Sequence, residues 1–214
     1  MNIGILGTGT VGAAIGSRLL ALGHAVKMGA RSATSEKAAA WAGSQGPQAS
    51  HGTFADAAAS GEMVFNCTAG QASLAALEQA GAENLNGKVL VDVANPLDFS
   101  RGMPPSLMVV NTDSLAEQIQ RAFPGARVVK TLNTMNAMVM VNPALVPGDH
   151  DVFVSGNDAG AKAQVTALLR DFGWRSIIDL GDITSARGVE MILPLWVGLM
   201  GVKQTPMFNF KVVV

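Results

Sequence analysis

Three glycines near the start of the chain could do chemistry through their backbone. They lie in the segment Gly7-Thr8-Gly9-Thr10-Val11-Gly12, between an apolar run at 2–6 and a segment of helical period at 11–22. Gly7 would permit a tight turn, Gly9 would let the backbone approach a pyrophosphate, and Gly12 would let the helix pack on the strand. The segment therefore predicts a dinucleotide-binding loop at a helix N-terminus. The alternative is a glycine-rich turn that binds nothing.

The tip of the expected second strand carries basic and hydroxyl residues. Chains that select NAD place an acidic residue about twenty positions after the glycines, where it bonds the ribose 2′-hydroxyl. This chain has Arg31 and Ser32 there, followed by Thr34 and Lys37. A guanidinium and hydroxyls suit a 2′-phosphate, so we expect NADP, with Thr8 adding a further hydroxyl. The alternative is that Arg31 is a solvated surface side chain and that Ser32 or Thr34 only caps the next helix.

The elements that would position these residues alternate between strands and helices. Short Val- and Ile-rich runs predict strands at 2–6, 25–29, 63–67, 88–93, 127–132, 151–156, 175–179 and 208–214. Segments of helical period predict helices at 11–22, 35–42, 72–80, 114–123, 159–172 and 184–202, and 54–60 reads as one more short turn. The pattern is typical of an α/β Rossmann fold, a doubly wound, mostly parallel sheet. We expect an NADP-binding domain at 1–148 and a small C-terminal α/β extension at 149–214 for substrate or subunit contacts.

Other cofactor contacts should follow the strands, because ligands of open parallel sheets lie outside the carboxyl ends of the strands. Small residues and amides at these positions suit a nicotinamide ring. The lone cysteine, Cys67, occupies one of these positions and has no histidine nearby in a recognisable arrangement. We therefore interpret it as a buried small thiol rather than a nucleophile. The expected contacts are Cys67, Thr68, Ala69, Ala94, Asn95 and Pro96, with Thr131, Leu132 and Asn133 after the segment RVVK at 127–130.

Composition excludes several classes of partner. The 214 residues suffice for one compact unit, and 15 basic against 16 acidic residues give a formal charge of -1, which leaves no footprint for nucleic acid. The apolar run at 191–202 is shorter than the roughly 18 residues of a membrane span. One cysteine and no secretory signal fit a soluble cytoplasmic protein. Because 49% of residues are hydrophobic and 14% charged, we also expect a homodimer.

Proton donors are scarce among the candidate residues. The chain has no tyrosine, and His24, His51 and His150 fall at positions that read as structural or solvated. Lys130 and Arg187 could donate protons or contact phosphate. Alternatively, Lys130 could be a strand-end side chain that extends to solvent, and Arg187 could form an ion pair with Glu190 one helical turn away. Hydride transfer to a flavin-type ring needs mainly stacking and orientation, so this scarcity favours such an acceptor. No residue spacing suggests a metal site.

Several motifs together resemble a known family. The segments IGILGTGTVG, LGHAVKMGARS, VDVANPL, RVVKTLNTMNA, VFVSGNDAGAK and LGDITSARGVEMILPLWVGLM are similar, in this order, to deazaflavin-dependent NADP reductases and the oxidoreductase domains of Steap proteins. The resemblance implies NADP, a contact at Ala137, and direct hydride transfer to a deazaflavin or flavin without a catalytic side chain. It implies an acceptor site formed by Leu132, Asn133, Arg187, Met191 and Leu193. Asn133, Met191 and Leu193 depart from the polar residues that those reductases carry.

Two other functions remain open. One is an imine reductase akin to pyrroline-5-carboxylate reductase, although only about sixty residues remain for the C-terminal helical half that those enzymes use in dimerising. The other is a non-catalytic NADPH-sensing protein. Acceptor-dependent oxidation of NADPH would distinguish an enzyme from a sensor.

Overall fold

Eight strands of the chain form one sheet in the order β10-β9-β8-β5-β4-β1-β2-β3. The structure, a computed structural model, describes all 214 residues. The strands are β1 (Asn2–Leu6), β2 (Ala25–Ala30), β3 (Ala49–Thr53), β4 (Met63–Asn66), β5 (Val89–Asp92), β8 (Arg127–Thr131), β9 (Asp151–Ser155) and β10 (Ser176–Asp179). All neighbours pair parallel except β8 and β9. The expected doubly wound, mostly parallel sheet is therefore confirmed.

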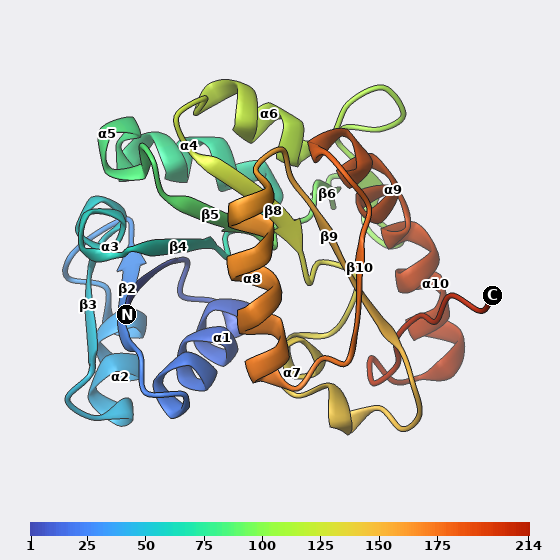
Figure 1. The fold of residues 1–214 in the computed structure, drawn as a ribbon, viewed down its shortest axis with the longest axis horizontal. Coiled ribbons are helices and arrows are strands. Elements are labelled where there is room, and N and C mark those ends of the chain that lie inside the picture. The colour runs from blue at the N-terminus through green and yellow to red at the C-terminus, as the bar shows by residue number, and fades with distance from the viewer.

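Helices cover both faces of this sheet (Figure 1). One face carries α1 (Thr10–Ala21), α2 (Glu36–Gln45), α7 (Ala137–Val141) and α8 (Ala159–Phe172). The other carries α3 (Phe54–Ser60), α4 (Gly70–Ala80), α5 (Ala82–Leu85), α6 (Leu115–Ala122) and the start of α9 (Ala186–Met191). The remaining elements are the hairpin β6 (Leu97–Asp98) and β7 (Ser106–Leu107), the short helices η1 (Pro143–Leu145) and η2 (Ile183–Ser185), and α10 (Leu193–Lys203).

Helix α1 is held close to the sheet and to α2 by small residues. Gly12, Ile15, Gly16 and Leu19 form its buried face, as the 3.6-residue period predicts. A Cβ at Gly16 would lie 2.6 Å from Cζ2 of Trp41, so glycine is what lets α2 pack there. Gly16 thus serves helix packing rather than ligand contact.

Several elements differ from the sequence predictions. The polar edge strand β3 and the helices α5 and α7 were not predicted, and 54–60 is a helix rather than a turn. The final segment is not a strand, although Asp151 N–H donates to the carbonyl of Phe210 at 2.9 Å. The single helix expected at 184–202 is divided into η2, α9 and α10. Pro194 explains the break after α9, because it has no N–H to donate and its ring crowds the preceding turn.

The helical run Ile183–Lys203 is long and apolar enough, by length and composition alone, to cross a membrane; its most apolar window has a mean hydropathy of 1.2 and is 22% buried. The first half is bound to the sheet domain, because Glu190 pairs with Lys130 and Arg187 with Glu117. The second half, the 11 residues of α10, measures about 16 Å. That is roughly half of the hydrocarbon thickness that a span must cross.

Candidate active site

The glycine loop joins β1 to α1 in a conformation that only glycine allows at two positions. Gly7 has φ +122°, and a Cβ there would lie 2.7 Å from the carbonyl oxygen of Cys67. A Cβ at Gly12 would overlap the carbonyl of Gly7. Gly9 differs, because a Cβ there would meet no atom within 4 Å. Gly7 and Gly12 therefore shape the loop, whereas Gly9 leaves room for a ligand to approach the backbone.

Two helices begin at this edge of the sheet without a side-chain cap. The N-cap residues of α1 and α4 are Gly9 and Ala69, and neither can cap its helix through a side chain. By contrast, the first turns of α2, α3, α6 and α8 are capped by Ser35, Thr53, Ser114 and Asp158. The first amides of α1 and α4 thus remain available to an anion, as in a dinucleotide-binding site.

A cavity of about 860 Å³ lies between the glycine loop, the tip of β2 and α4. It brings together nine of the residues expected to bind cofactor: Gly7, Thr8, Gly9, Arg31, Ser32, Lys37, Cys67, Thr68 and Ala69. Eight more residues line it that the sequence did not single out: Ala30, Ser35, Phe54, Gln71, Ala72, Ala75, Ala76 and Gln79. Five of these eight come from α4, whose small and amide residues carry no motif. Eight predicted contacts do not line this cavity: Thr10, Val11, Gly12, Thr34, Ala94, Asn95, Pro96 and Ala137.

The tip of β2 presents cations that no carboxylate neutralises. Arg31 and Lys37 are exposed, and neither forms an ion pair. The Ser32 and Thr34 hydroxyls lie 2.8 Å apart, while Ser35 caps α2. The alternative that Ser32 or Thr34 caps this helix is therefore wrong. A phosphate at this tip would meet two uncompensated positive charges.

Hydrogen bonds to buried polar side chains hold the loop after β4 in place. Thr68 donates its hydroxyl to Asn66 Oδ1 at 2.7 Å, and Asn66 Nδ2 donates to Asp92 Oδ1 at 2.8 Å. Burial, with a smaller contribution from the Asp92 carboxylate, raises the pKa of the Cys67 thiol far above its usual range. The thiol is therefore protonated at neutral pH and is not a nucleophile.

Asn95, Asn133 and α9 are joined at the carboxyl ends of β5 and β8. Asn133 Nδ2 donates to Asn95 Oδ1 at 3.0 Å and to the carbonyl of Val189 at 2.7 Å, and Asn95 Nδ2 donates to the carbonyl of Asn133 at 3.0 Å. Leu132, which precedes Asn133, has φ +62°, an uncommon value for a residue with a side chain. These bonds place the loops after β5 and β8 against α9.

Lys130 is fully buried between two carboxylates. Its Nζ lies 2.8 Å from Asp92 Oδ2 and 2.9 Å from Glu190 Oε1, and it also donates to the carbonyl of Ala94. Glu190 accepts in addition the N–H groups of Leu115 and Ala116 at the start of α6. Burial alone would lower the pKa of Lys130, but the two carboxylates raise it overall. Lys130 therefore remains charged, with all three protons engaged.

Arg187 forms an ion pair with Glu117 rather than with Glu190, the partner that the sequence offered as an alternative. Its Nε donates to Glu117 Oε2 at 2.9 Å and its second terminal nitrogen donates to Oε1, whereas Glu190 faces Lys130. The alternative in which Arg187 pairs with Glu190 is therefore wrong, because the Glu190 carboxylate contacts Lys130. Hydrogen bonds lower the pKa of Glu117. Those from Arg187 contribute most, and the bond with Ser114 contributes less.

The five residues expected to form the acceptor site differ in solvent exposure. Leu132, Asn133 and Leu193 are buried, Arg187 is half-buried and Met191 is exposed. The Met191 sulfur accepts the N–H of Asn111 at 3.3 Å. None of the five lines the cavity at the glycine loop.

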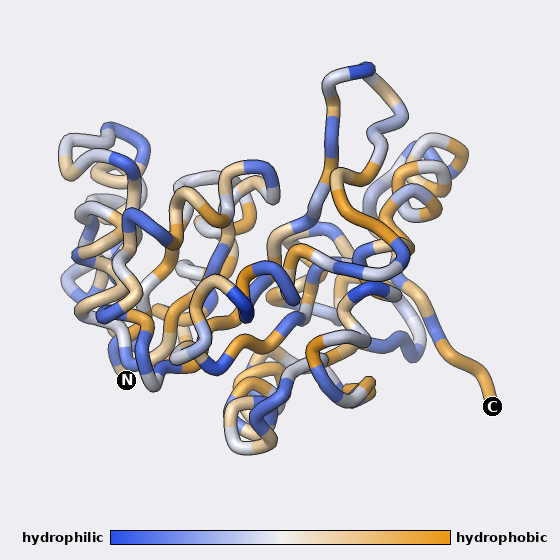
Figure 2. Tube along the Cα trace, turned by 90° about the horizontal axis from the view of Figure 1, so that it is seen from above, coloured by the Kyte–Doolittle hydropathy of each residue, from blue (hydrophilic) through white to orange (hydrophobic).

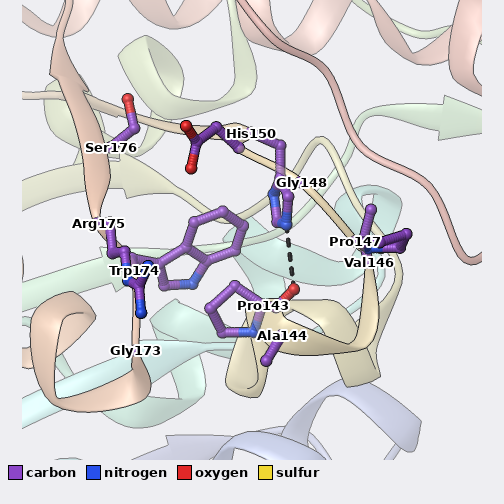
Figure 3. A pocket seen from close by; sticks show the side chains of 11 residues that line it. Pro143, Ala144, Val146, Pro147, Gly148, His150, Gly173, Trp174, Arg175 and Ser176 are labelled. Atoms are coloured by element: carbon purple, nitrogen blue, oxygen red, sulfur yellow. Dashed lines mark hydrogen bonds between the residues drawn. The ribbon is translucent and has the colours of Figure 1, made fainter.

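Another hollow lies near the starts of β9 and β10, and its His150 and Trp174 rings are already hydrogen-bonded (Figure 3). His150 Nε2 lies 3.0 Å from the carbonyl of Pro143, and its Nδ1 lies 2.9 Å from Asn209 Nδ2. Trp174 Nε1 donates to the carbonyl of Met140 at 2.9 Å. His150 is therefore a packing residue, as its position in the sequence indicated.

Comparison with known proteins places this architecture in a family. The family sequence model described as NADP oxidoreductase coenzyme F420-dependent matches residues 2–96. The F420-dependent NADP reductase of Methanocaldococcus jannaschii is 32% identical over 148 residues, which cover 67% of this chain and 64% of that protein. Rat metalloreductase STEAP3 is 31% identical over 91% of this chain, which spans only 38% of the length of STEAP3.

Solved structures agree. A crystal structure from Arthrobacter sp. FB24, which carries the provisional name F420-dependent NADP-reductase, matches with a TM-score of 0.94 at 55% identity over 99% of both chains. An imine reductase from Aspergillus terreus, in a complex with NADPH4, matches with a TM-score of 0.65 at 20% identity, over 95% of this chain and 62% of its own, a likeness of fold alone. The chain belongs to the family of F420-dependent NADP oxidoreductases.

Proposed function

We propose that the chain transfers a hydride between NADP(H) and the ring of a flavin or deazaflavin. The observation that carries this proposal is the division of charge at the carboxyl edge of the sheet. Arg31 and Lys37 are unpaired at the cofactor end, whereas Lys130 and Arg187, at the opposite end, are committed to carboxylates. The first end suits a phosphorylated dinucleotide, and the second offers no cation poised to protonate a substrate.

The residues of the glycine loop and the tip of β2 fit NADP. The uncapped amides of α1 and α4 would hold the pyrophosphate, and Arg31 with Ser32, Thr34 and Lys37 would hold the 2′-phosphate. The loops at 67–69, 94–96 and 132–137 would surround the nicotinamide. When bound, NADPH supplies a hydride, and the acceptor ring takes a proton from water. The chain itself orients the two rings.

The hydrogen bonds of Lys130 indicate which class of acceptor is reduced. Reduction of a ketone or hydroxy acid needs a positioned proton donor. All three protons of Lys130 are bound, to Asp92, Glu190 and the carbonyl of Ala94. This arrangement makes Lys130 a structural cation and favours a ring that takes its proton from solvent.

The proposal is tested by mixing the protein with NADPH and a series of acceptors and following NADPH absorbance. We expect oxidation with free flavin or deazaflavin, and none with simple ketones or hydroxy acids. Oxidation with cyclic imines alone would indicate an imine reductase. Binding of NADPH without oxidation by any acceptor would indicate a sensor protein.

Substitution of Gly9 separates ligand binding from folding. Because a Cβ at Gly9 meets no protein atom within 4 Å, Gly9→Ala should leave the thermal midpoint of unfolding unchanged. The same Cβ would occupy the space where the pyrophosphate approaches, so NADPH affinity should fall at least about tenfold. Isothermal titration and thermal unfolding measure the two effects. Unaltered NADPH binding in this variant would place the pyrophosphate elsewhere.

We further propose a cytoplasmic homodimer without nucleic acid or membrane partners. The outer face of α10 and the C-terminal tail expose apolar residues, among them Leu195 at 55% and Val202 at 80%. Monomers rarely leave apolar patches of this kind in water. Light scattering after size exclusion should give a dimer mass, and Leu195→Asp should give a monomer. Leu180→Asp, which changes an exposed leucine in the loop after β10, is the control; a monomeric wild type would refute the dimer.

A further inference from the structure

Two polar side chains end neighbouring strands inside the core. β4 and β5 read MVFN and VLVD, so on the hydropathy scale of Figure 2 each strand turns hydrophilic only at its last residue. These last residues, Asn66 and Asp92, lie opposite each other in the register of the sheet, and neither is exposed. A polar group costs free energy to bury unless it is hydrogen-bonded. The hydrogen bonds of Asn66 and Asp92 therefore have to offset that cost.

Asn66 uses every hydrogen-bonding position of its amide. Its Oδ1 accepts the hydroxyl of Thr68 at 2.7 Å and the N–H of Thr68 at 3.3 Å. Its Nδ2 donates to Ser73 Oγ, near the start of α4, at 3.1 Å and to Asp92 Oδ1 at 2.8 Å. Asn66 thus joins the loop after β4 and the start of α4 to the end of β5.

Asp92 extends these contacts to the neighbouring elements. Its Oδ1 also accepts the N–H of Ala94 at 3.3 Å, and its Oδ2 accepts a proton from Lys130 Nζ at 2.8 Å. Lys130 in turn contacts the carbonyl of Ala94 and the carboxylate of Glu190 in α9. The buried side chains therefore link the loop after β4 to the loop after β5, to β8 and to α9.

The start of α4 also packs directly on the loop after β5. A Cβ at Gly70, the first residue of α4, would overlap the carbonyl oxygen of Asn95. Glycine at this position lets the two segments approach each other closely, and the hydrogen bond between Asn66 and Asp92 spans the same junction. Two separate features of the chain therefore set the spacing between α4 and the loop after β5.

Thr68 connects this junction to the wall of the cofactor cavity. Thr68 and Ala69 line the cavity beside the glycine loop, whereas Asn66 does not. The Thr68 hydroxyl donates to Asn66, so it is not available to donate to a ligand. Asn66 therefore acts on the cavity by placing Thr68 and the uncapped amides of α4, not by touching a ligand.

We propose that Asn66 is a positioning residue, whose hydrogen bond to Asp92 sets the spacing between the start of α4 and the loop at 94–96. This inference rests on the proposed function, in which amides of α4 hold the pyrophosphate of NADP(H) and the loop at 94–96 contacts the nicotinamide. Because both groups belong to one molecule, a change in this spacing misplaces the nicotinamide when the pyrophosphate is bound. A misplacement of about 1 Å can slow a reaction roughly a hundredfold.

Asn66→Asp breaks this hydrogen bond and keeps the size of the side chain. It places a carboxylate oxygen where Nδ2 lies 2.8 Å from Asp92 Oδ1 in the wild type, and two carboxylates at that distance repel each other. The exchanged pair, Asn66→Asp with Asp92→Asn, restores the bond in the opposite direction, because the new amide donates to the new carboxylate while its oxygen still accepts from Lys130. Only the 3.3 Å bond from the N–H of Ala94 loses its acceptor.

Titration with NADP+ and with 2′,5′-ADP, which lacks the nicotinamide half, separates positioning from general damage. We expect Asn66→Asp to bind NADP+ about tenfold more weakly and 2′,5′-ADP as the wild type does, and the exchanged pair to regain most of the NADP+ affinity. Hydride transfer at saturating NADPH should slow at least about tenfold in Asn66→Asp and recover in the exchanged pair. Equal losses for the two ligands, or no recovery in the exchanged pair, would overturn the inference.

Asn84→Ala is the matched control. Asn84 Nδ2 donates to the carbonyl of Ala80 at 2.7 Å, at the other end of α4. This variant should lower the thermal midpoint of unfolding and bind both ligands as the wild type does. A loss of NADP+ affinity equal to that of Asn66→Asp would mean that any weakened contact of α4 suffices, which contradicts the inference. If Asn66→Asp does not fold, Asn66→Ser replaces it, because it removes the amide without adding a charge, and the same losses are expected.

The outcomes distinguish this inference from the function on which it rests. If the wild type binds no NADP+, the proposed function and the inference both fail. If NADP+ binds but no flavin or deazaflavin is reduced, the proposed hydride transfer fails, and the two binding titrations decide the role of Asn66. If the wild type reduces a flavin and Asn66→Asp matches it in binding and rate, only the inference fails.

Discussion

Arg31→Ala is expected to weaken NADPH binding roughly ten- to a hundredfold while NADH binding changes little. Arg31 is exposed at the tip of β2, lines the cavity beside the glycine loop and has no carboxylate partner. A charge-assisted bond from its guanidinium to the 2′-phosphate is worth about 1.5 to 3 kcal/mol, and NADH lacks that phosphate. Isothermal titration with both cofactors measures the difference.

Arg175→Ala is the matched control, because Arg175 is an exposed arginine at the start of β10, away from the glycine loop. It should bind both cofactors as the wild type does. If Arg31→Ala lost equal affinity for NADPH and NADH, Arg31 would not hold the 2′-phosphate, and the preference for NADPH would need another explanation.

Lys130→Met should lower the free energy of unfolding by about 3 to 5 kcal/mol, the usual cost of leaving buried charges without their partner. Lys130 is fully buried between Asp92 and Glu190. Methionine keeps most of the volume but leaves both carboxylates without their cation. Urea denaturation of wild type and variant gives the difference.

Lys162→Met removes a cation from a more exposed pair, in which Asp179 is 55% exposed. Such pairs contribute about 1 kcal/mol or less, so this control should unfold near the wild type. A loss in Lys130→Met no larger than in Lys162→Met would show that Lys130 does not hold α9 and β5 together.

Most of the sheet could be predicted because its central strands are continuous apolar runs. β3 was missed because its sequence, Ala49–Thr53, is short and polar, as edge strands often are. α7 was missed because Ala137–Val141 is apolar throughout and too short to show a helical period. β9 and β10 join the same sheet as the residues before them, and the division of the chain at 148 stays a prediction.

Only part of the candidate site could be predicted from the sequence. The glycine loop and Arg31 follow local rules, so their spacing was informative. The choice of Glu117 rather than Glu190 as the partner of Arg187 depends on how α9 packs on α6 and β8, which no spacing along the chain encodes. The wall that α4 contributes to the cavity was missed because Gln71, Ala72 and Gln79 belong to no motif.

The most direct test of the account is single-turnover hydride transfer without oxygen. The protein is mixed with NADPH deuterated at the transferred position and with a flavin or deazaflavin, and both absorbances are followed together. The account predicts that the acceptor is reduced in step with NADPH oxidation and that deuterium slows both. NADPH that binds but reduces neither acceptor would contradict hydride transfer to a flavin-type ring.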